Sequence, residues 1–161
     1  MVKLFIMDVD GVLTDSGMYY SQNGDELKKF STYDGKAMEI LRLKGVKTAI
    51  ITAEDTKIVW NRAKKTKVDF LFQGVENKLT VAKELCMKEG ISLDNEVSYI
   101  GDDINDIELL NFVKFKACPA NAMMKVREID GIKLLSNKGG NGAVREFVEL
   151  LINEGCLSEP K

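Results

Sequence analysis

The chain begins with an apolar run that stops at a pair of aspartates. Residues Leu4–Met7 are all apolar, and Asp8 and Asp10 follow before Gly11. A short apolar run bounded by a turn signal is typical of a buried strand in a parallel sheet. In open α/β sheets, ligands bind at the carboxyl ends of the strands, which is where the two carboxylates would lie. We predict that both side chains enter one crevice, because residues i and i+2 of an extended chain face the same way.

Strands and helices alternate along the rest of the chain, which predicts an α/β fold with a mostly parallel, doubly wound sheet. The 161 residues, of which 45% are hydrophobic, can bury a core, so we expect residues 1–161 to form a single domain. Further strands are expected at 46–51, 68–72, 96–100, 113–117 and 131–135. Helices are expected at 35–44, 55–65, 77–89, 105–110, 122–128 and 143–153. Asp34 is the predicted N-cap of the first helix.

Residues 17–30 predict a small β-hairpin. Asn23-Gly24 lies between two extended arms and favours a type I′ turn, in which both central residues have positive φ. The arms carry five large apolar residues, which are Met18, Tyr19, Tyr20, Leu27 and Phe30. A two-stranded ribbon is marginally stable alone. We therefore expect the hairpin to pack on another surface, either a second subunit or its own domain.

Composition argues against several classes of partner. The net charge is −2 and the sequence contains no basic block, which disfavours nucleic acid. No apolar run reaches the roughly 18 residues needed to span a bilayer, and no signal peptide is visible, so we expect a cytoplasmic protein without a membrane partner. The three cysteines lack metal-ligand spacing, which is typical of small apolar residues in a reducing compartment. Because there is no histidine, any general acid or base must be another residue type, such as a carboxylate or lysine.

Polar residues follow four of the predicted strands at the point where each strand ends. They are Asp8 and Asp10, then Thr52, then Lys78 at the start of the next helix, and finally Asp102, Asp103 and Asp106. The carboxyl ends of parallel strands meet at one edge of a sheet, so these side chains can converge. Five carboxylates in one crevice require a cation, and oxygen ligands beside a substrate phosphate suit Mg²⁺.

This arrangement predicts phosphate chemistry. Thr52 and Lys78 would supply a hydrogen-bond donor and a positive charge to phosphate oxygens. Asp8 would then be free to act as a nucleophile, because carboxylates form aspartyl-phosphates. Asp10 could protonate the leaving oxygen and later deprotonate water.

The ordered set resembles the motifs of the haloacid dehalogenase superfamily. The matching segments are Asp8-Val-Asp10-Gly-Val-Leu-Thr14-Asp15, Ile50-Ile-Thr52, Lys78 and Gly101-Asp102-Asp103-Ile-Asn-Asp106. The resemblance implies that Asp8 is the nucleophile and Asp10 the general acid/base. It implies that Thr52 and Lys78 bind phosphate. It further implies that Mg²⁺ is bound by Asp8, by Asp10 through its carbonyl, and by Asp102, while Asp103 and Asp106 are supporting carboxylates.

The short segments between these motifs leave no room for the cap domain that covers the substrate in many members of the superfamily. The chain therefore resembles the capless branch that hydrolyses 3-deoxy-2-keto sugar acid phosphates. That branch includes phosphatases of eight-carbon octulosonate 8-phosphates and of nine-carbon, sialic-acid-like 9-phosphates. Its members form tetramers through the hairpin, so the resemblance implies a homotetramer and a small sugar phosphate as the substrate.

Residue 54 bears on the choice between these substrates. The octulosonate enzymes usually read Thr-Gly-Arg after the second strand, where this chain has Thr52-Ala53-Glu54. The nine-carbon phosphatases carry Glu there and a lysine eleven residues later, which here is Lys65. We therefore expect a nine-carbon 9-phosphate, with the eight-carbon 8-phosphate as the alternative. Glu54 would bind sugar hydroxyls or pair with Lys65 or Arg62, unless it is only a solvated acid near a helix start.

Three other functions fit parts of the pattern. A phospho-acceptor signalling domain also has an acidic pocket with Thr and Lys, but its acceptor Asp lies on the third strand and not the first. A catalytically weak tetramerisation module is the second alternative, although the four residues Asp8, Asp10, Lys78 and Asp102 argue together for catalysis. A polynucleotide phosphatase is disfavoured by the absence of a basic patch.

Overall fold

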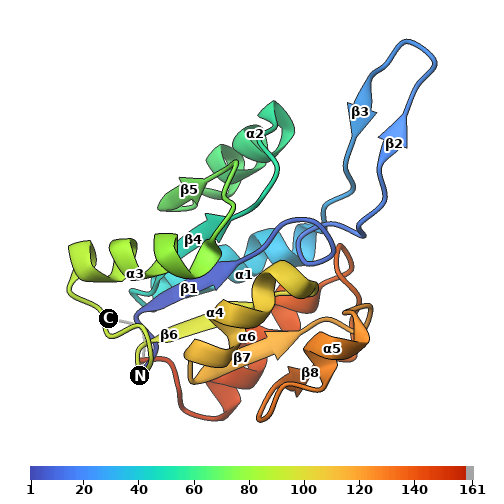
Figure 1. Cartoon of the computed structure of the whole chain (residues 1–161). Coiled ribbons are helices and arrows are strands. Elements are labelled where there is room, and N and C mark those ends of the chain that lie inside the picture. Colours follow the sequence, from blue (N-terminus) through green and yellow to red (C-terminus); the bar gives the residue numbers. More distant parts are fainter. Residues whose placement is uncertain (159–161) are drawn as a thin grey trace.

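The computed structural model describes residues 1–158 and has a layered α/β fold (Figure 1). The last three residues of the predicted domain lie outside the described residues. The main sheet has the strand order β5-β4-β1-β6-β7-β8, and every neighbouring pair is parallel. Its strands are β1 (Leu4–Met7), β4 (Lys47–Ile51), β5 (Phe70–Phe72), β6 (Val97–Ile100), β7 (Phe115–Cys118) and β8 (Lys133–Leu134). The predicted doubly wound parallel sheet is confirmed, and β1 lies near its centre.

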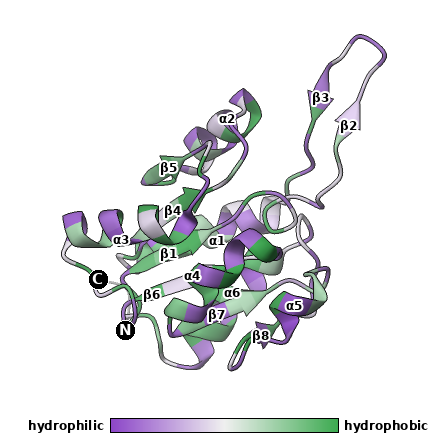
Figure 2. Ribbon diagram, viewed as in Figure 1, coloured by the Kyte–Doolittle hydropathy of each residue, from purple (hydrophilic) through white to green (hydrophobic). Residues whose placement is uncertain are grey.

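Helices cover both faces of the sheet. Alternate residues of β1 face opposite sides, so this strand contributes side chains to the core on each face. Phe5 and Met7 join a core formed with α1 (Thr32–Leu43), α2 (Lys57–Thr66) and α6 (Ala143–Asn153). Leu4 and Ile6 join a second core formed with α3 (Lys78–Glu89), α4 (Ile107–Phe112) and α5 (Met124–Arg127). A short 3₁₀ helix, η1 (Ile104–Asp106), precedes α4. Figure 2 shows β1 as a hydrophobic strand between these two layers.

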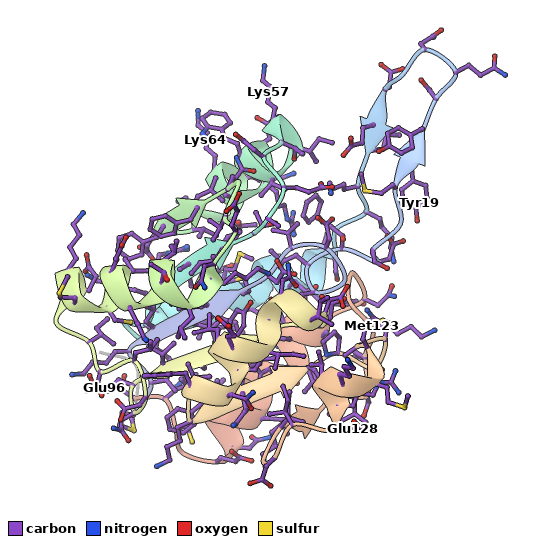
Figure 3. The ribbon with its side chains drawn as sticks, in the orientation of Figure 1. Tyr19, Lys57, Lys64, Glu96, Met123 and Glu128 are labelled. Carbon is purple, nitrogen blue, oxygen red and sulfur yellow. The ribbon has the colours of Figure 1, made fainter. Side chains whose placement is uncertain are left out.

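The hairpin of β2 (Tyr19–Tyr20) and β3 (Glu26–Leu27) projects from the body of the molecule (Figure 1). Figure 3 shows Tyr19 on this projection, outside the outline of the sheet and its helices. The predicted type I′ turn is wrong, because Gly24 has a positive φ but Asn23 does not. Instead the Ser21 hydroxyl accepts the N–H groups of Asn23 and Asp25 and closes a wider loop.

The N-cap of α1 also differs from the prediction. Ser31 is the cap, and its side chain accepts the N–H of Tyr33 at 3.2 Å. Asp34 lies buried in the first turn, where Oδ1 accepts the N–H of Arg145 at 3.0 Å. Asp34 thus satisfies the start of α6, whose own N-cap, Gly142, has no side chain to do so. Among the described residues, no helix combines the length and the apolar character that a membrane crossing requires.

Candidate active site

The carboxyl ends of β1, β4 and β6 open into a pocket of about 310 Å³. Most of the predicted site residues line this aspartate pocket, namely Asp8, Asp10, Thr52, Glu54, Asp102 and Asp103. Ser16, Met18, Ala53 and Asn105 complete the lining. The extended geometry predicted for the two aspartates is wrong, because β1 ends at Met7 and Asp10 lies in a turn. Both reach the pocket nonetheless, since the chain reverses at Gly11, where φ is +83°.

Lys78 joins two carboxylates beneath the pocket. Its Nζ lies 2.7 Å from Asp8 Oδ1 and 2.6 Å from Asp106 Oδ1. Only 5% of Asp8, 2% of Lys78 and none of Asp106 is exposed. Burial lowers the pKa of the Lys78 ammonium, but Asp8 and Asp106 outweigh this effect and raise it, so the lysine stays charged. The predicted phosphate-binding lysine therefore also neutralises the floor of the pocket.

Asp106 organises the turn that carries the other aspartates. Its Oδ1 accepts hydrogen bonds from Lys78 and the Tyr99 hydroxyl, and its Oδ2 accepts the N–H groups of Asp102 and Asp103 at 2.8 and 3.1 Å. A carboxylate has about four acceptor positions, so four donors saturate it. A Cβ on Gly101 would lie 2.5 Å from that of Asp106, which explains the glycine there. Asp106 therefore holds the turn in place and is not free to bind a ligand.

In the buried cluster of Asp8, Asp102 and Asp106, the first two carboxylates remain available to a cation. Oxygen atoms of Asp8, Asp102 and Asp106 all lie within 4.8 Å of one another. Within residues 1–158, the buried Asp102 Oδ1 has no hydrogen-bond partner, and leaving such an oxygen unsatisfied is costly. A Cβ at Gly11 would lie 1.9 Å from Asp102 Oδ2, so this approach requires glycine. An unpartnered oxygen in an all-oxygen site fits Mg²⁺.

The same two carboxyl groups have raised pKa values. Burial raises the pKa of Asp8 to about 7, with a further contribution from Asp106 and opposition from Lys78. Burial raises the pKa of Asp102 to about 8, and the neighbouring Asp8 and Asp106 add to the effect. A bound cation reverses this balance because it favours the charged carboxylates. The charged forms of Asp8 and Asp102 are therefore more favourable with a metal ion bound than without one.

Glu54 lies at the rim of the pocket, but its partner is not the predicted one. Its Oε2 lies 2.6 Å from Nζ of Lys28, the residue that directly follows β3 of the hairpin. Arg62 instead donates to the backbone carbonyl of Ser31 at 2.6 Å. Arg62 and Lys65 line a separate groove of about 470 Å³ between α1 and α2. The predicted pairing of Glu54 with Arg62 or Lys65 is wrong, because α2 directs those two side chains toward α1.

Comparison with known proteins places this site in a family. The model of the haloacid dehalogenase-like hydrolase family matches residues 23–146. The chain belongs to the haloacid dehalogenase-like hydrolases. The matched segment includes Thr52, Lys78 and the turn at Asp102, while Asp8 and Asp10 lie before it.

Relatives within this hydrolase family align over more of the chain. The 3-deoxy-D-manno-octulosonate 8-phosphate phosphatase KdsC of Escherichia coli strain K12 is 36% identical over 162 residues, covering 99% of this chain and 85% of the relative. A probable YrbI family phosphatase from Pseudomonas syringae superposes with a TM-score of 0.90 at 41% identity, covering 94% of this chain and 85% of that one.

The structure of a third relative contains bound ligands. The 3-deoxy-D-manno-octulosonate 8-phosphate phosphatase from Moraxella catarrhalis superposes with a TM-score of 0.89 at 37% identity, covering 94% of this chain and 86% of that one. That structure is described as a complex with a magnesium ion, a phosphate ion and a KDO molecule. The relatives from Escherichia coli and Moraxella catarrhalis are both named for the eight-carbon 8-phosphate.

Sequence reasoning missed three residues of this hydrolase site. Tyr99 could have been found, since a buried tyrosine needs a partner for its hydroxyl and this one precedes the Gly101-Asp102 turn. Asn121 donates to the carbonyl of Gly11 at 3.0 Å and accepts the N–H of Gly139 at 2.7 Å. Lys28 and Asn121 contact residues that are distant in the sequence, so no local sequence pattern identifies their partners.

Proposed function

We propose that the protein is a Mg²⁺-dependent phosphomonoesterase that acts on a 3-deoxy-2-keto sugar acid phosphate, and that 3-deoxy-D-manno-octulosonate 8-phosphate is its first candidate substrate. One observation carries the proposal. Asp8 stands at the floor of the pocket with one oxygen fixed by Lys78, beside an Asp102 oxygen that lacks a partner within residues 1–158. This arrangement suits a fixed nucleophile next to a cation site. The relatives supply the substrate class.

The residues divide the reaction between them. Asp8 would attack phosphorus, and the ester bond to the sugar oxygen would break while Asp10 donates a proton to that oxygen. Asp10 would then take a proton from water, which attacks the aspartyl-phosphate and releases phosphate. Lys78 keeps the attacking carboxylate oriented, and the buried Thr52 would bind phosphate oxygens.

The proposed ligands of Mg²⁺ are the carboxylates of Asp8 and Asp102 and the backbone carbonyl of Asp10. When bound, the ion would offset the negative charge that these groups and the substrate phosphate bring together. Asp103 caps η1 by accepting the N–H of Ile104, and it supports the site through that turn.

Phosphate release from an aryl phosphate and from the octulosonate 8-phosphate, with Mg²⁺ or with EDTA, tests the mechanism. We expect Asp8→Asn to lower turnover by several orders of magnitude without unfolding the protein, as losses of a nucleophile do in comparable enzymes. Asp130→Asn, at an exposed aspartate outside the pocket, is the matched control and should retain full activity. Substantial turnover by Asp8→Asn, or full activity in EDTA, would contradict the mechanism.

The nine-carbon 9-phosphate remains a second candidate because Glu54, and not arginine, lines the pocket rim. A glutamate would repel a substrate carboxylate directly beside it, whereas a longer sugar would place its carboxylate further out. The ratio of kcat/KM for the 8-phosphate and the 9-phosphate, in wild type and Glu54→Arg, decides between them. A tenfold preference of wild type for the 8-phosphate would exclude the nine-carbon assignment, and an unchanged ratio in Glu54→Arg would show that residue 54 does not select the substrate.

We further infer a homotetramer assembled through the hairpin, supported by the exposed apolar residues Tyr19, Tyr20 and Leu27. We also infer a reducing compartment, the cytoplasm, because the thiols of Cys86, Cys118 and Cys156 are all unpaired.

A further inference from the structure

Lys28 directly follows β3 of the hairpin, and its side chain reaches the rim of the aspartate pocket. Its Nζ lies 2.6 Å from Asp10 Oδ1 and 2.6 Å from Glu54 Oε2, with Met18 Sδ 3.6 Å away. Lys28 is half-buried at this position. A partly desolvated lysine is stabilised by acidic groups beside it. A third carboxylate, Glu26, lies further away, with Oε1 4.0 Å from the Lys28 Nζ. Asp10 and Glu54 both line the pocket.

A backbone bridge connects the segment that carries Lys28 with the segment that carries Asp10. Phe30, two residues after Lys28, pairs with Thr14 in an isolated antiparallel bridge. The Thr14 hydroxyl accepts the N–H groups of Gly11 and Ser16, each at 3.3 Å, and so fixes the loop that follows Asp10. This bridge places Lys28 against Asp10 even though the outer part of the hairpin projects from the body.

A second contact holds the base of the hairpin from the opposite side. The guanidinium of Arg62 lies 5.3 Å from the ring centroid of Phe30 and donates to the carbonyl of Ser31. Ser31 in turn caps α1. The position of Lys28 is therefore supported by contacts of the neighbouring Phe30 and Ser31 with α1, α2 and the Thr14 loop of the same chain.

The contacts to Asp10 are asymmetric. Lys28 and the Thr14 hydroxyl both approach Oδ1, at 2.6 and 3.4 Å. Within residues 1–158, no hydrogen bond to Oδ2 is found. A group that transfers a proton to a leaving oxygen needs one oxygen held in a fixed orientation and the other available to the substrate. The Asp10 carboxylate meets both requirements.

We propose that Lys28 is a positioning residue for Asp10, and that Glu54 holds Lys28 in place. The inference deepens the proposed function, on which it rests, since it concerns how the proton donor of that reaction is oriented. The ammonium of Lys28 already contacts two carboxylates at hydrogen-bond distance, so its charge is offset within the chain. The contact with Lys28 gives Glu54 an indirect role, through Lys28 and Asp10.

Steady-state kinetics of Lys28→Met, Glu54→Gln and the double variant test this arrangement. The substrates are an aryl phosphate without a carboxylate and the octulosonate 8-phosphate, both with Mg²⁺. We expect Lys28→Met to lower kcat about tenfold or more on both substrates with little change in KM, because general acid catalysis contributes roughly 10² to 10⁴ in rate. Glu54→Gln should cause a smaller loss, and none in the Lys28→Met background, because coupled residues are not additive.

Two further variants control the experiment. Lys29→Met removes the neighbouring lysine, which bonds Asn141 and lies outside the pocket, and it should match wild type. Lys28→Arg restores the charge and should recover part of kcat. If Lys28→Met fails to fold in a thermal melt, Glu54→Gln still reports on the contact, and wild-type kcat in that variant would contradict the inference.

The outcomes separate this inference from the proposed function. A rise in KM for the sugar acid alone, with kcat unchanged, would show that Lys28 binds the substrate carboxylate and would overturn the positioning role. Wild-type kinetics in Lys28→Met would overturn it as well. A wild-type protein that hydrolyses neither substrate with Mg²⁺ would overturn the proposed function, and this inference with it.

Discussion

The floor of the aspartate pocket, which is formed by Asp8, Lys78 and Asp106, differs from the β2–β3 hairpin in one respect. Contacts within one chain bury the side chains of the floor but leave those of the hairpin exposed. On the floor, Lys78 bridges Asp8 and Asp106, and all three are almost fully buried. On the hairpin, 66% of Tyr20 and 66% of Leu27 remain exposed. The charges of the floor are largely offset within the chain, whereas the hairpin presents apolar side chains to solvent. The comparison indicates that the floor of the pocket is organised within one subunit.

Removing the lysine of the floor should have the largest effect on folding stability. Lys78→Met leaves two buried carboxylates without their shared cation, so we expect a loss of roughly 3 to 5 kcal/mol in the free energy of unfolding. Urea denaturation without metal measures it. Lys83→Met, which removes a lysine on the same helix α3 that lies over the Phe112 ring, is the control for losing a lysine there. A loss below about 1 kcal/mol, as for an exposed ion pair, would contradict the account of the floor.

Adding Mg²⁺ should stabilise the floor in a pH-dependent manner. The pKa values of Asp8 and Asp102, about 7 and about 8, lie above the 3.8 of an ordinary aspartate. Between about pH 4 and pH 8 the metal-free folded state therefore binds more protons than the unfolded chain, and its stability falls as pH rises.

Mg²⁺ competes with these protons, so its stabilising effect should increase over the same range. At a fixed Mg²⁺ concentration of one hundred times the Kd at pH 8.5, we expect the free energy of unfolding to rise by about 2.7 kcal/mol at pH 8.5. The rise at pH 5.5 should be clearly smaller. Thermal melts at the two pH values, with Mg²⁺ or EDTA, measure the difference. A shift in Tm that is equal at both would show that the metal does not replace protons on these carboxyl groups.

Changing the hairpin should have the smallest effect on folding. Leu27→Ser removes an exposed side chain, so the free energy of unfolding of the subunit should change by no more than about 0.5 kcal/mol. The molar mass from light scattering at micromolar concentration should nevertheless fall from that of a tetramer. Met87→Ser, at an apolar residue that is 81% exposed on α3, should keep the wild-type mass. A fully active wild-type monomer would refute assembly through the hairpin.

The sequence predicted the sheet and most of the pocket because these depend on local patterns. The apolar run Leu4–Met7 forms the central strand, and the polar residues after β1, β4 and β6 line one pocket. The helix from Ala143 to Asn153 has the predicted bounds. Each of these follows from periodicity or from the shared edge of parallel strands.

The errors arose where a residue bonds to a distant part of the chain. Asp34 was expected to cap its own helix, but the fold uses it at the start of α6, and Ser31 takes its place. Glu54 was expected to pair with a residue one helical face away, but the hairpin supplies Lys28 from 26 positions earlier in the sequence. Partners of this kind depend on how elements are brought together, which periodicity does not encode.

The contacts of Asn121 determine when, during synthesis of the chain, the loop around Gly11 can be fixed in place. Asn121 connects the loop of Gly11 to that of Gly139, and a Cβ on Gly139 would lie only 1.9 Å from the carbonyl oxygen of Gly11. The loop that carries Asp10 is thus held by residues that leave the ribosome more than a hundred positions later. An incomplete polypeptide that already contains Asp8 and Asp10 lacks the contacts that fix the loop around Gly11. The pocket can therefore take its final shape only after Asn121 and Gly139 have been synthesised.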